Sequence, residues 1–249
     1  MLVSIIIITV NEARTIEQTI EKARMSARFP SGKRVSIEII VSDGGSTDET
    51  LKIAHQKADK VIVGPMGRYI QLNAGAKQAK GEILLFLHAD TLLPETAVIR
   101  IVHKLRDPKI IGGAFMKTWN WNPMIKRSSL LKFMALSWQG IGNRLVRLLR
   151  AFPGDNAIFV RKFIYDELRG FRPSWICEDF DFSRRLKNYG KKRFLCMPFS
   201  VITSARRYEK YGFLRTNLQW FWMYWLWRFG MPQERLKIKF KKYSRLQEH

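Results

Sequence analysis

The sequence predicts an α/β fold, with a mostly parallel mixed sheet flanked by helices, from three observations. Apolar runs at residues 3–9, 35–41 and 83–87 have the length and composition of buried strands. Apolar residues at helical spacing follow the first run, at Ile16 and Ile20. Each run stops at polar or glycine-rich residues, and ligands of open α/β sheets bind beyond the carboxyl ends of the strands.

Residues 3–9 lead into a polar turn that contains Asn11 and Glu12. We expect Asn11 to cap the helix that begins near Ile16, because Asn is a preferred N-cap residue. Residues 35–41 lead into a loop that contains Asp43, Gly44 and Gly45. Glycines in such a loop allow the backbone to approach a ligand closely.

The third run ends at His88 and Asp90, a polar pair that the interior of a strand would not tolerate. Residues two apart in a strand face the same side, so an imidazole and a carboxylate here could bind one divalent metal. A second interpretation is that Asp90 or Thr91 caps a helix that starts at Pro94. The residues alone leave both interpretations open.

Five ordered motifs, SIIIITVNEARTI, VSDGGSTDET, GRYIQLNAGAKQAKGEILLFLHADT, GDNAIFVR and CEDFDFSRRL, span much of the chain. Over about residues 1–215 they resemble the motifs of the family-two glycosyltransferases, which have the nucleotide-sugar-binding GT-A fold. The last two motifs, together with TSARRYEKYG, are most similar to a subgroup encoded near radical-enzyme, selenium or arsenosugar genes.

The resemblance implies a nucleotide-sugar donor, expected to be a UDP-sugar, and a divalent Mn²⁺ or Mg²⁺ that bridges its diphosphate. It assigns the metal to Asp90, with His88 in place of the first Asp of an Asp-x-Asp motif. Gly44 stands where many relatives have a second consecutive Asp, so the identity of the base stays open. The resemblance places the remaining donor-side residues at Thr9, Asn11, Glu12, Asp43 and Arg68.

The same resemblance places the catalytic carboxylate at Asp179, with Glu178 and Asp181 as its competitors. A helix that begins at Glu178 would put Phe182 and Leu186 on one face. Since acidic residues are favoured in the first turn of a helix, the alternative is that these carboxylates only stabilise the start of this helix. Transfer of a sugar requires a base for the acceptor hydroxyl and charge neutralisation on the leaving diphosphate. Residues expected on the acceptor or diphosphate side are Asp155, Asn156, Glu178, Arg206 and Arg207.

The resemblance therefore implies an inverting, metal-dependent glycosyltransferase. The alternative activity of a sugar-phosphate nucleotidyltransferase has similar nucleotide and metal requirements. That reaction does not explain a base such as Asp179 in a helix late in the chain. A single-stranded nucleic-acid-binding protein is a further alternative, since basic residues alternate with aromatic ones. We expect no nucleic-acid partner, because carboxylates at the strand ends repel phosphate.

The formal net charge of +23 is unevenly distributed, and residues 108–154 contain no Asp or Glu. Residues 124–152 interleave apolar and basic side chains, and residues 220–227 hold four of the eight Trp residues. Such patterns are typical of helices that lie on anionic membrane surfaces. Packing of the aromatic helix against its own domain or a second subunit is the alternative, so a homo-oligomer stays open.

We therefore divide the chain into a GT-A domain, residues 1–212, and a basic aromatic helical appendage, residues 213–249. The apolar run of the appendage is much shorter than the roughly 20 residues that a helix needs to span a bilayer. The N-terminus lacks the pattern of a signal peptide, and the two cysteines, Cys177 and Cys196, give no disulfide framework. We expect a cytoplasmic protein, peripheral at the inner face of the membrane, with a lipid as the expected acceptor.

Overall fold

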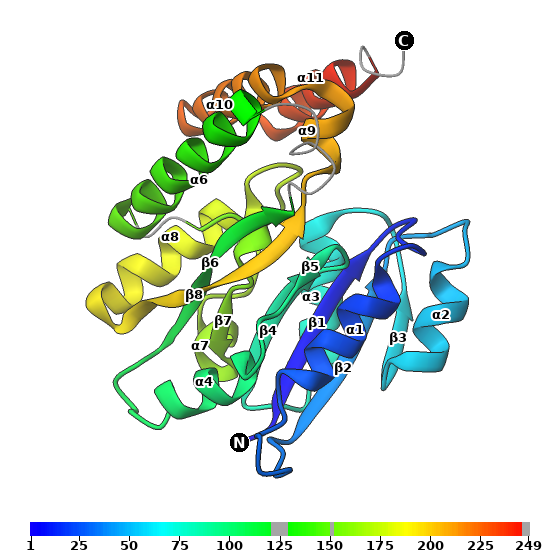
Figure 1. Cartoon of the computed structure of the whole chain (residues 1–249), viewed down its shortest axis with the longest axis vertical. Coiled ribbons are helices and arrows are strands. Elements are labelled where there is room, and N and C mark those ends of the chain that lie inside the picture. Colours follow the sequence, from blue (N-terminus) through cyan, green and yellow to red (C-terminus); the bar gives the residue numbers. More distant parts are fainter. Residues whose placement is uncertain (121–128, 150–151, 246–249) are drawn as a thin grey trace.

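The computed structural model describes residues 1–120, 129–149 and 152–245. Within these residues, eight strands form one mixed sheet in the order β3-β2-β1-β4-β7-β6-β8-β5 (Figure 1). The strands are β1 Val3–Thr9, β2 Ile37–Asp43, β3 Lys60–Val63, β4 Ile83–His88, β5 Thr91–Leu92, β6 Gly112–Asn120, β7 Phe159–Arg161 and β8 Phe194–Ser204.

Strands β3, β2, β1 and β4 are parallel, so their carboxyl ends meet at one edge of the sheet. The register pairs Thr9 with Asp43, and Ile8 with His88. Three of the polar strand ends found in the sequence therefore lie side by side. The second strand begins two residues later than predicted, because the N–H of Val35 donates to the Ala27 carbonyl in a preceding turn.

The helices of the parallel half cover both faces of the sheet (Figure 1). On one face, α1 Ile16–Met25, α2 Thr50–Lys57 and α4 Ala97–Lys104 contribute to a core with Ile5, Ile7 and Leu85. On the other, α3 Arg68–Gln78, α7 Lys162–Glu167 and α8 Glu178–Gly190 pack on Ile6, Leu84 and Phe86. Buried branched side chains on both faces explain why these strands lack polar alternation.

The predicted cap at Asn11 is wrong, and so is the alternative interpretation in which Asp90 or Thr91 caps a helix. Helix α1 begins after Thr15 without a side-chain cap, and the side chain of Asn11 instead accepts a hydrogen bond from the Thr47 N–H at 2.8 Å. Helix α4 begins after Thr96, also without a side-chain cap, so neither Asp90 nor Thr91 caps it. The Asn11 amide is used to join two loops at the site edge of the sheet.

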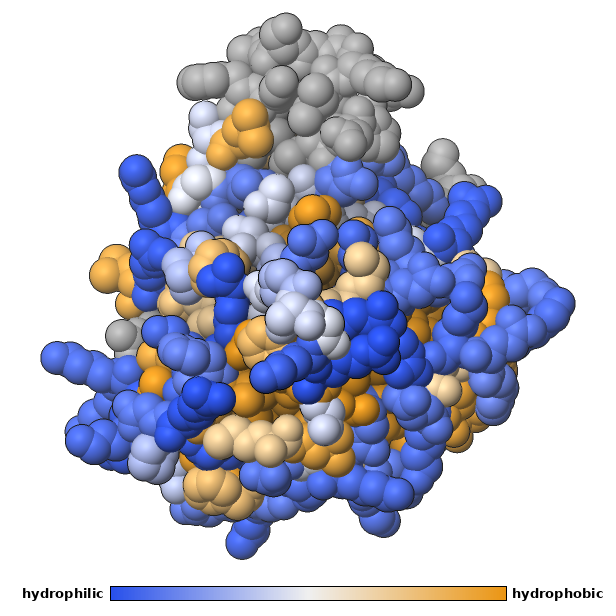
Figure 2. Space-filling model, turned by 60° about the horizontal axis from the view of Figure 1, so that its bottom comes forward, coloured by the Kyte–Doolittle hydropathy of each residue, from blue (hydrophilic) through white to orange (hydrophobic). Residues whose placement is uncertain are grey.

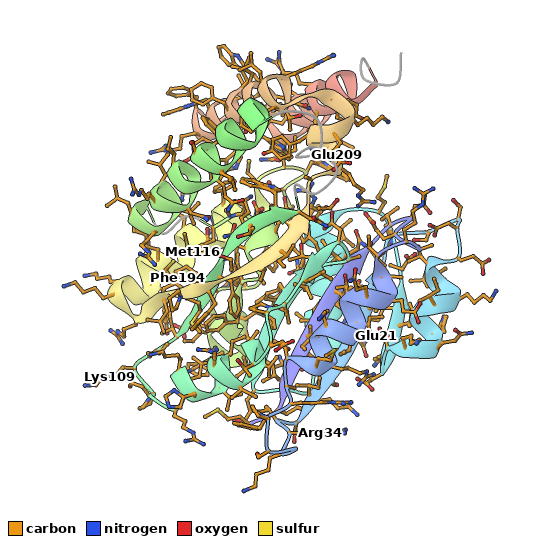
Figure 3. The ribbon with its side chains drawn as sticks, viewed as in Figure 1. Glu21, Arg34, Lys109, Met116, Phe194 and Glu209 are labelled. Atoms are coloured by element: carbon orange, nitrogen blue, oxygen red, sulfur yellow. The ribbon has the colours of Figure 1, made fainter. Side chains whose placement is uncertain are left out.

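Four helices gather at one end of the molecule, beyond the sheet (Figure 1): α6 Ser129–Leu149, α9 Arg206–Tyr211, α10 Phe213–Arg228 and α11 Gln233–Arg245. Figure 3 places Glu209 of α9 at this end, whereas Arg34 and Lys109 lie at the opposite end. Short 3₁₀ turns occupy Gly154–Asn156 and Lys191–Arg193. Of the basic and apolar stretch 124–152, residues 124–128 and 150–151 lie outside the described residues.

Helix α10 begins at Phe213, and the division of the chain into a domain and an appendage stays a prediction. One side of α10 and α11 is buried: Met223 and Leu236 form a small core with Ile176 and Cys177. The other side of α10 exposes large apolar side chains, including Trp222 at 58%. Among the described helices, none combines the length and apolar character needed to cross a membrane.

Candidate active site

A cavity of about 700 Å³ opens where the parallel strands end and the four terminal helices begin. Its walls come from β1, β4, β6, β8, α3 and α8, and from α6, α9 and α10 above them. Nine of the predicted site residues line it, namely Thr9, Glu12, Arg68, His88, Asp90, Asp155, Asp179, Arg206 and Arg207. Four others, Asn11, Asp43, Asn156 and Glu178, lie outside its lining.

The floor of the cavity is braced by Gln71, whose amide donates to the carbonyls of Thr9 and Ser42, both at 2.9 Å. Asp43 is fully buried, and its carboxylate accepts hydrogen bonds from the backbone N–H groups of Gly45 and Ser46. It thereby organises the glycine-rich loop. The predicted contact of Asp43 with the base or ribose stays a prediction.

Arg206 connects the turns after β1 and β4. Its guanidinium is 2.6 and 2.8 Å from the Glu12 carboxylate oxygens and 3.2 Å from Asp90. The hydrogen bond to Glu12 raises the pKa of Arg206. A cation therefore lies between the carboxylates of Glu12 and Asp90.

His88 and Asp179 meet at Gly154. The Gly154 N–H donates to the Asp179 carboxylate, which also accepts from the Phe180 N–H at 2.7 Å. A Cβ added at Gly154 would lie 2.8 Å from His88 Nε2 and 3.2 Å from Asp179 Oδ2. Burial and the Arg68 guanidinium lower the pKa of His88. The imidazole is therefore neutral at pH 7 and has a nitrogen lone pair available for a ligand or a proton.

The three late carboxylates occupy different environments. Asp181 pairs with Arg185 at 2.8 Å, on the side of α8 that faces the 168–170 segment. Glu178 is buried and lies 3.5 Å from Arg68. Burial raises the pKa of Glu178 to about 7. Of the three carboxylates, Asp179 alone lines the cavity.

A second ion pair lies on the wall formed by β6. Lys117 Nζ is 2.8 Å from Asp155 and 4.7 Å from the centre of the Trp119 ring. The side chain of Asn156 donates to the Phe115 carbonyl at 2.7 Å and so fixes the backbone beside Asp155. Lys117 and Asp155 neutralise each other at the cavity wall.

Unpartnered polar atoms concentrate around this cavity. In the described part of the chain, four buried side-chain atoms have no hydrogen-bond partner: Thr9 Oγ1, Asn156 Oδ1, Glu178 Oε2 and Arg207 Nη1. Thr9 and Arg207 line the cavity, and the other two residues adjoin Asp155 and Asp179. Buried polar atoms are normally hydrogen-bonded, so this concentration indicates a site that a polar ligand completes.

A divalent metal would need oxygen or nitrogen ligands from the cavity wall. Within the described ranges, no three His, Cys, Asp or Glu side chains form a metal-binding group. Mg²⁺ in nucleotide enzymes typically takes one or two carboxylates and completes its shell with substrate phosphates and water. The Asp90 carboxylate, with the neutral His88 ring beside the same cavity, fits that requirement when a diphosphate supplies further oxygens.

Several residues of the cavity were missed by sequence reasoning. Lys117 and Trp119 lie in a strand, and aromatic residues Trp220 and Tyr224 lie in the appendage. Nothing in the local sequence distinguishes Lys117 from the other lysines. A signal for the appendage was present, since an aromatic helix with polar Asn217 and Gln219 could have been expected to face a polar cavity.

Residues 4–169 match the sequence profile of Glycosyl transferase family 2. Two curated relatives are a UDP-Glc:alpha-D-GlcNAc-diphosphoundecaprenol beta-1,3-glucosyltransferase, WfaP, of Escherichia coli and a PGL/p-HBAD biosynthesis glycosyltransferase of Mycobacterium tuberculosis. The first is 33% identical over 44% of this chain and 43% of its own length. The second is 27% identical over 73% of this chain and 68% of its own length.

Solved structures of similar fold include TarS residues 1–349 of Staphylococcus aureus, with a TM-score of 0.59, and the mannosyltransferase PcManGT of Pyrobaculum calidifontis with GDP-Man and Mn²⁺, with a TM-score of 0.56. They are 18% and 20% identical, cover 82% and 81% of this chain, and are themselves covered over 60% and 56%. The predicted GT-A fold is confirmed. The chain belongs to glycosyl transferase family 2 and spans less than half of the E. coli relative.

Proposed function

We propose that this protein transfers a sugar from a nucleotide-diphosphate donor, a UDP-sugar, to an acceptor hydroxyl by a metal-dependent, inverting displacement. The observation that carries the proposal is the meeting of His88, Asp90 and Asp179 in one cavity, although they come from β4, the turn after it and α8. His88 and Asp90 lie at the carboxyl end of a parallel strand, where ligands of open α/β sheets bind, and α8 brings Asp179 to the same cavity.

The nucleotide-sugar donor would bind at the end of the cavity where β1 and β4 terminate. Asp90, with His88 beside it, would hold the divalent metal, which supplies neutralisation of the leaving diphosphate when bound. Thr9 and Glu12 line the same end of the cavity, and the Thr9 hydroxyl has no hydrogen-bond partner of its own. Arg68 contributes a guanidinium near the expected diphosphate. Displacement of Arg206 from Asp90 would open the carboxylate to the metal.

Asp179 is proposed as the general base that removes the proton of the acceptor hydroxyl. Its carboxylate is oriented by two backbone N–H groups, those of Gly154 and Phe180, so that it stays directed along the cavity wall. Hydrogen bonds of this kind fix geometry, which is the first requirement of a general base. In an inverting displacement the hydroxyl attacks the anomeric carbon from the face opposite the diphosphate, and Asp179 receives its proton.

The acceptor is proposed to be a membrane lipid, with the protein peripheral at the cytoplasmic face. Apolar side chains of α6 and of α10 with its C-cap residue are exposed at the end of the molecule that holds the cavity, including Leu148 at 78% and the C-cap Phe229 at 81%. The opposite end, brought forward in Figure 2, presents mainly hydrophilic residues with smaller apolar patches between them. A high positive charge and exposed aromatic residues together favour an anionic lipid surface.

The experiment that tests the function is a donor screen by thermal shift with Mn²⁺, followed by nucleotide release in the presence of the best donor. We expect UDP and a UDP-sugar to raise the melting temperature only when Mn²⁺ or Mg²⁺ is present. A protein that no nucleotide or nucleotide sugar stabilises, with either metal, would contradict the proposed function.

A further inference from the structure

The two adjacent arginines of α9 have different surroundings. Arg206 is neutralised by Glu12 and Asp90. Arg207 lines the same cavity, but no ion pair with a carboxylate joins it among the described residues, and its Nη1 is buried without a hydrogen-bond partner. A buried guanidinium nitrogen without a partner is costly, because its interactions with water have been lost. This cost disappears when an anion binds.

Aromatic rings from the appendage hold Arg207 in position. Its guanidinium carbon is 5.1 Å from the centre of the Trp220 ring and 5.6 Å from that of Phe240. Contacts at these distances are typical of cation–π interactions, and they restrict the orientation of the planar group. Burial and the charge of Arg68 lower the pKa of Arg207. The group is therefore preorganised and lacks a counter-ion.

A second cation lies on the same helix. Lys210 also lines the cavity, is exposed, and forms no ion pair with a carboxylate in the described part of the chain. The other cavity cations have such partners: Lys117 pairs with Asp155, and Arg68 lies 3.5 Å from Glu178. Two unmatched positive charges suit a phosphate group, which carries up to two negative charges and binds a guanidinium through two oxygens.

We propose that Arg207, assisted by Lys210, binds a phosphate group of the acceptor. This inference rests on the proposed function, in which the donor diphosphate occupies the end of the cavity formed by Thr9, Glu12 and Asp90. Arg207 is the next residue after Arg206 on α9, and its guanidinium packs against Trp220 of α10 and Phe240 of α11. The acceptor would then carry its phosphate toward the appendage and its hydroxyl toward Asp179.

The test measures inorganic phosphate binding by calorimetry to protein already saturated with UDP and Mn²⁺. We expect the wild type to bind phosphate, Arg207→Gln to bind it about tenfold or more weakly, and Arg207→Lys to show a smaller loss because one charge remains. Lys210→Gln, at an exposed position, should also weaken phosphate binding. Arg228→Gln, which removes an exposed cation at the end of α10 outside the cavity, is the matched control and should change nothing.

UDP affinity in each variant separates the two sources of phosphate. Unchanged UDP affinity with lost phosphate binding supports an acceptor site. An equal loss of UDP affinity in Arg207→Gln would overturn it and assign Arg207 to the donor diphosphate. Unchanged phosphate binding in Arg207→Lys and Lys210→Gln would also overturn it, even if Arg207→Gln failed to fold. Failure of the wild type to bind UDP with Mn²⁺ would instead count against the proposed function itself.

Discussion

Gly154→Ala should impair catalysis while leaving the fold intact. The new Cβ would lie 2.8 Å from His88 Nε2, whereas ordinary contacts begin at 3.4 Å, so the imidazole must move by about 0.6 Å. The Asp179 oxygen, at 3.2 Å, must also shift slightly. The structure gives Gly154 no positive φ, so alanine introduces no backbone strain there. A misplacement of about 1 Å at a reacting group can reduce a rate about 100-fold.

We therefore expect the turnover of Gly154→Ala to fall about tenfold, because a shift of about 0.6 Å is smaller than the roughly 1 Å that can reduce a rate about 100-fold. The assay follows UDP release from the donor with Mn²⁺, at saturating donor, together with the melting temperature. Gly140→Ala in α6 is the matched control, because a Cβ there meets nothing within 4 Å. A folded Gly154→Ala enzyme that keeps wild-type turnover would refute the placement of His88 and Asp179 at the reaction centre.

Three further predictions concern the same site, and a fourth concerns the exposed side of α10. Asp90→Asn should sharply reduce Mn²⁺ affinity in calorimetry with UDP present; unchanged affinity would remove Asp90 from the metal site. Asp179→Asn should leave UDP binding intact and reduce transfer at least about 100-fold, as expected for loss of a general base; a larger defect in Glu178→Gln would mean that the base was misassigned. The folded state raises the pKa of Glu178 to about 7, so it holds this proton more tightly than the unfolded chain. The contribution of Glu178 to the free energy of unfolding is therefore fully present below about pH 4.5 and is lost as pH rises from 4.5 to about 7. The melting temperature of the wild type should fall between these two pH values relative to that of Glu178→Gln. Changing Trp222 and Trp225 to Ala should reduce sedimentation with anionic liposomes at low salt, whereas wild-type protein that ignores liposomes but binds single-stranded oligonucleotides tightly would exclude the membrane proposal.

The parallel half of the sheet was predictable because its signals are local. Runs of buried residues define β1 and β4, and the spacing of Ile16 and Ile20 defines α1. Caps were predicted less well. The Asn11 side chain bonds to Thr47, which is 36 residues away, so its preference for the helix terminus was outweighed by a tertiary contact.

Helix α8 was also predictable in part, where the signal is local, and not where the partners come from other elements. Phe182 and Leu186 share a buried face, as the helical spacing predicted. The helical spacing also puts Asp181 beside Arg185, four residues on, and the two form an ion pair at 2.8 Å. It could not distinguish Glu178 from Asp179, because that difference depends on Arg68 and Gly154, which approach α8 from other elements.

The arginine pair marks the limit of reasoning from sequence. Arg206 and Arg207 are neighbours in one motif, yet the carboxylates that neutralise Arg206 lie 194 and 116 residues away. The rings that hold Arg207 come from helices that begin after the motif ends. Because each side chain acquires its role from partners that only the fold supplies, the sequence leaves the two alike. The fold makes Arg206 the counter-ion of Glu12 and Asp90, whereas Arg207 has no ion pair with a carboxylate in the described part of the chain.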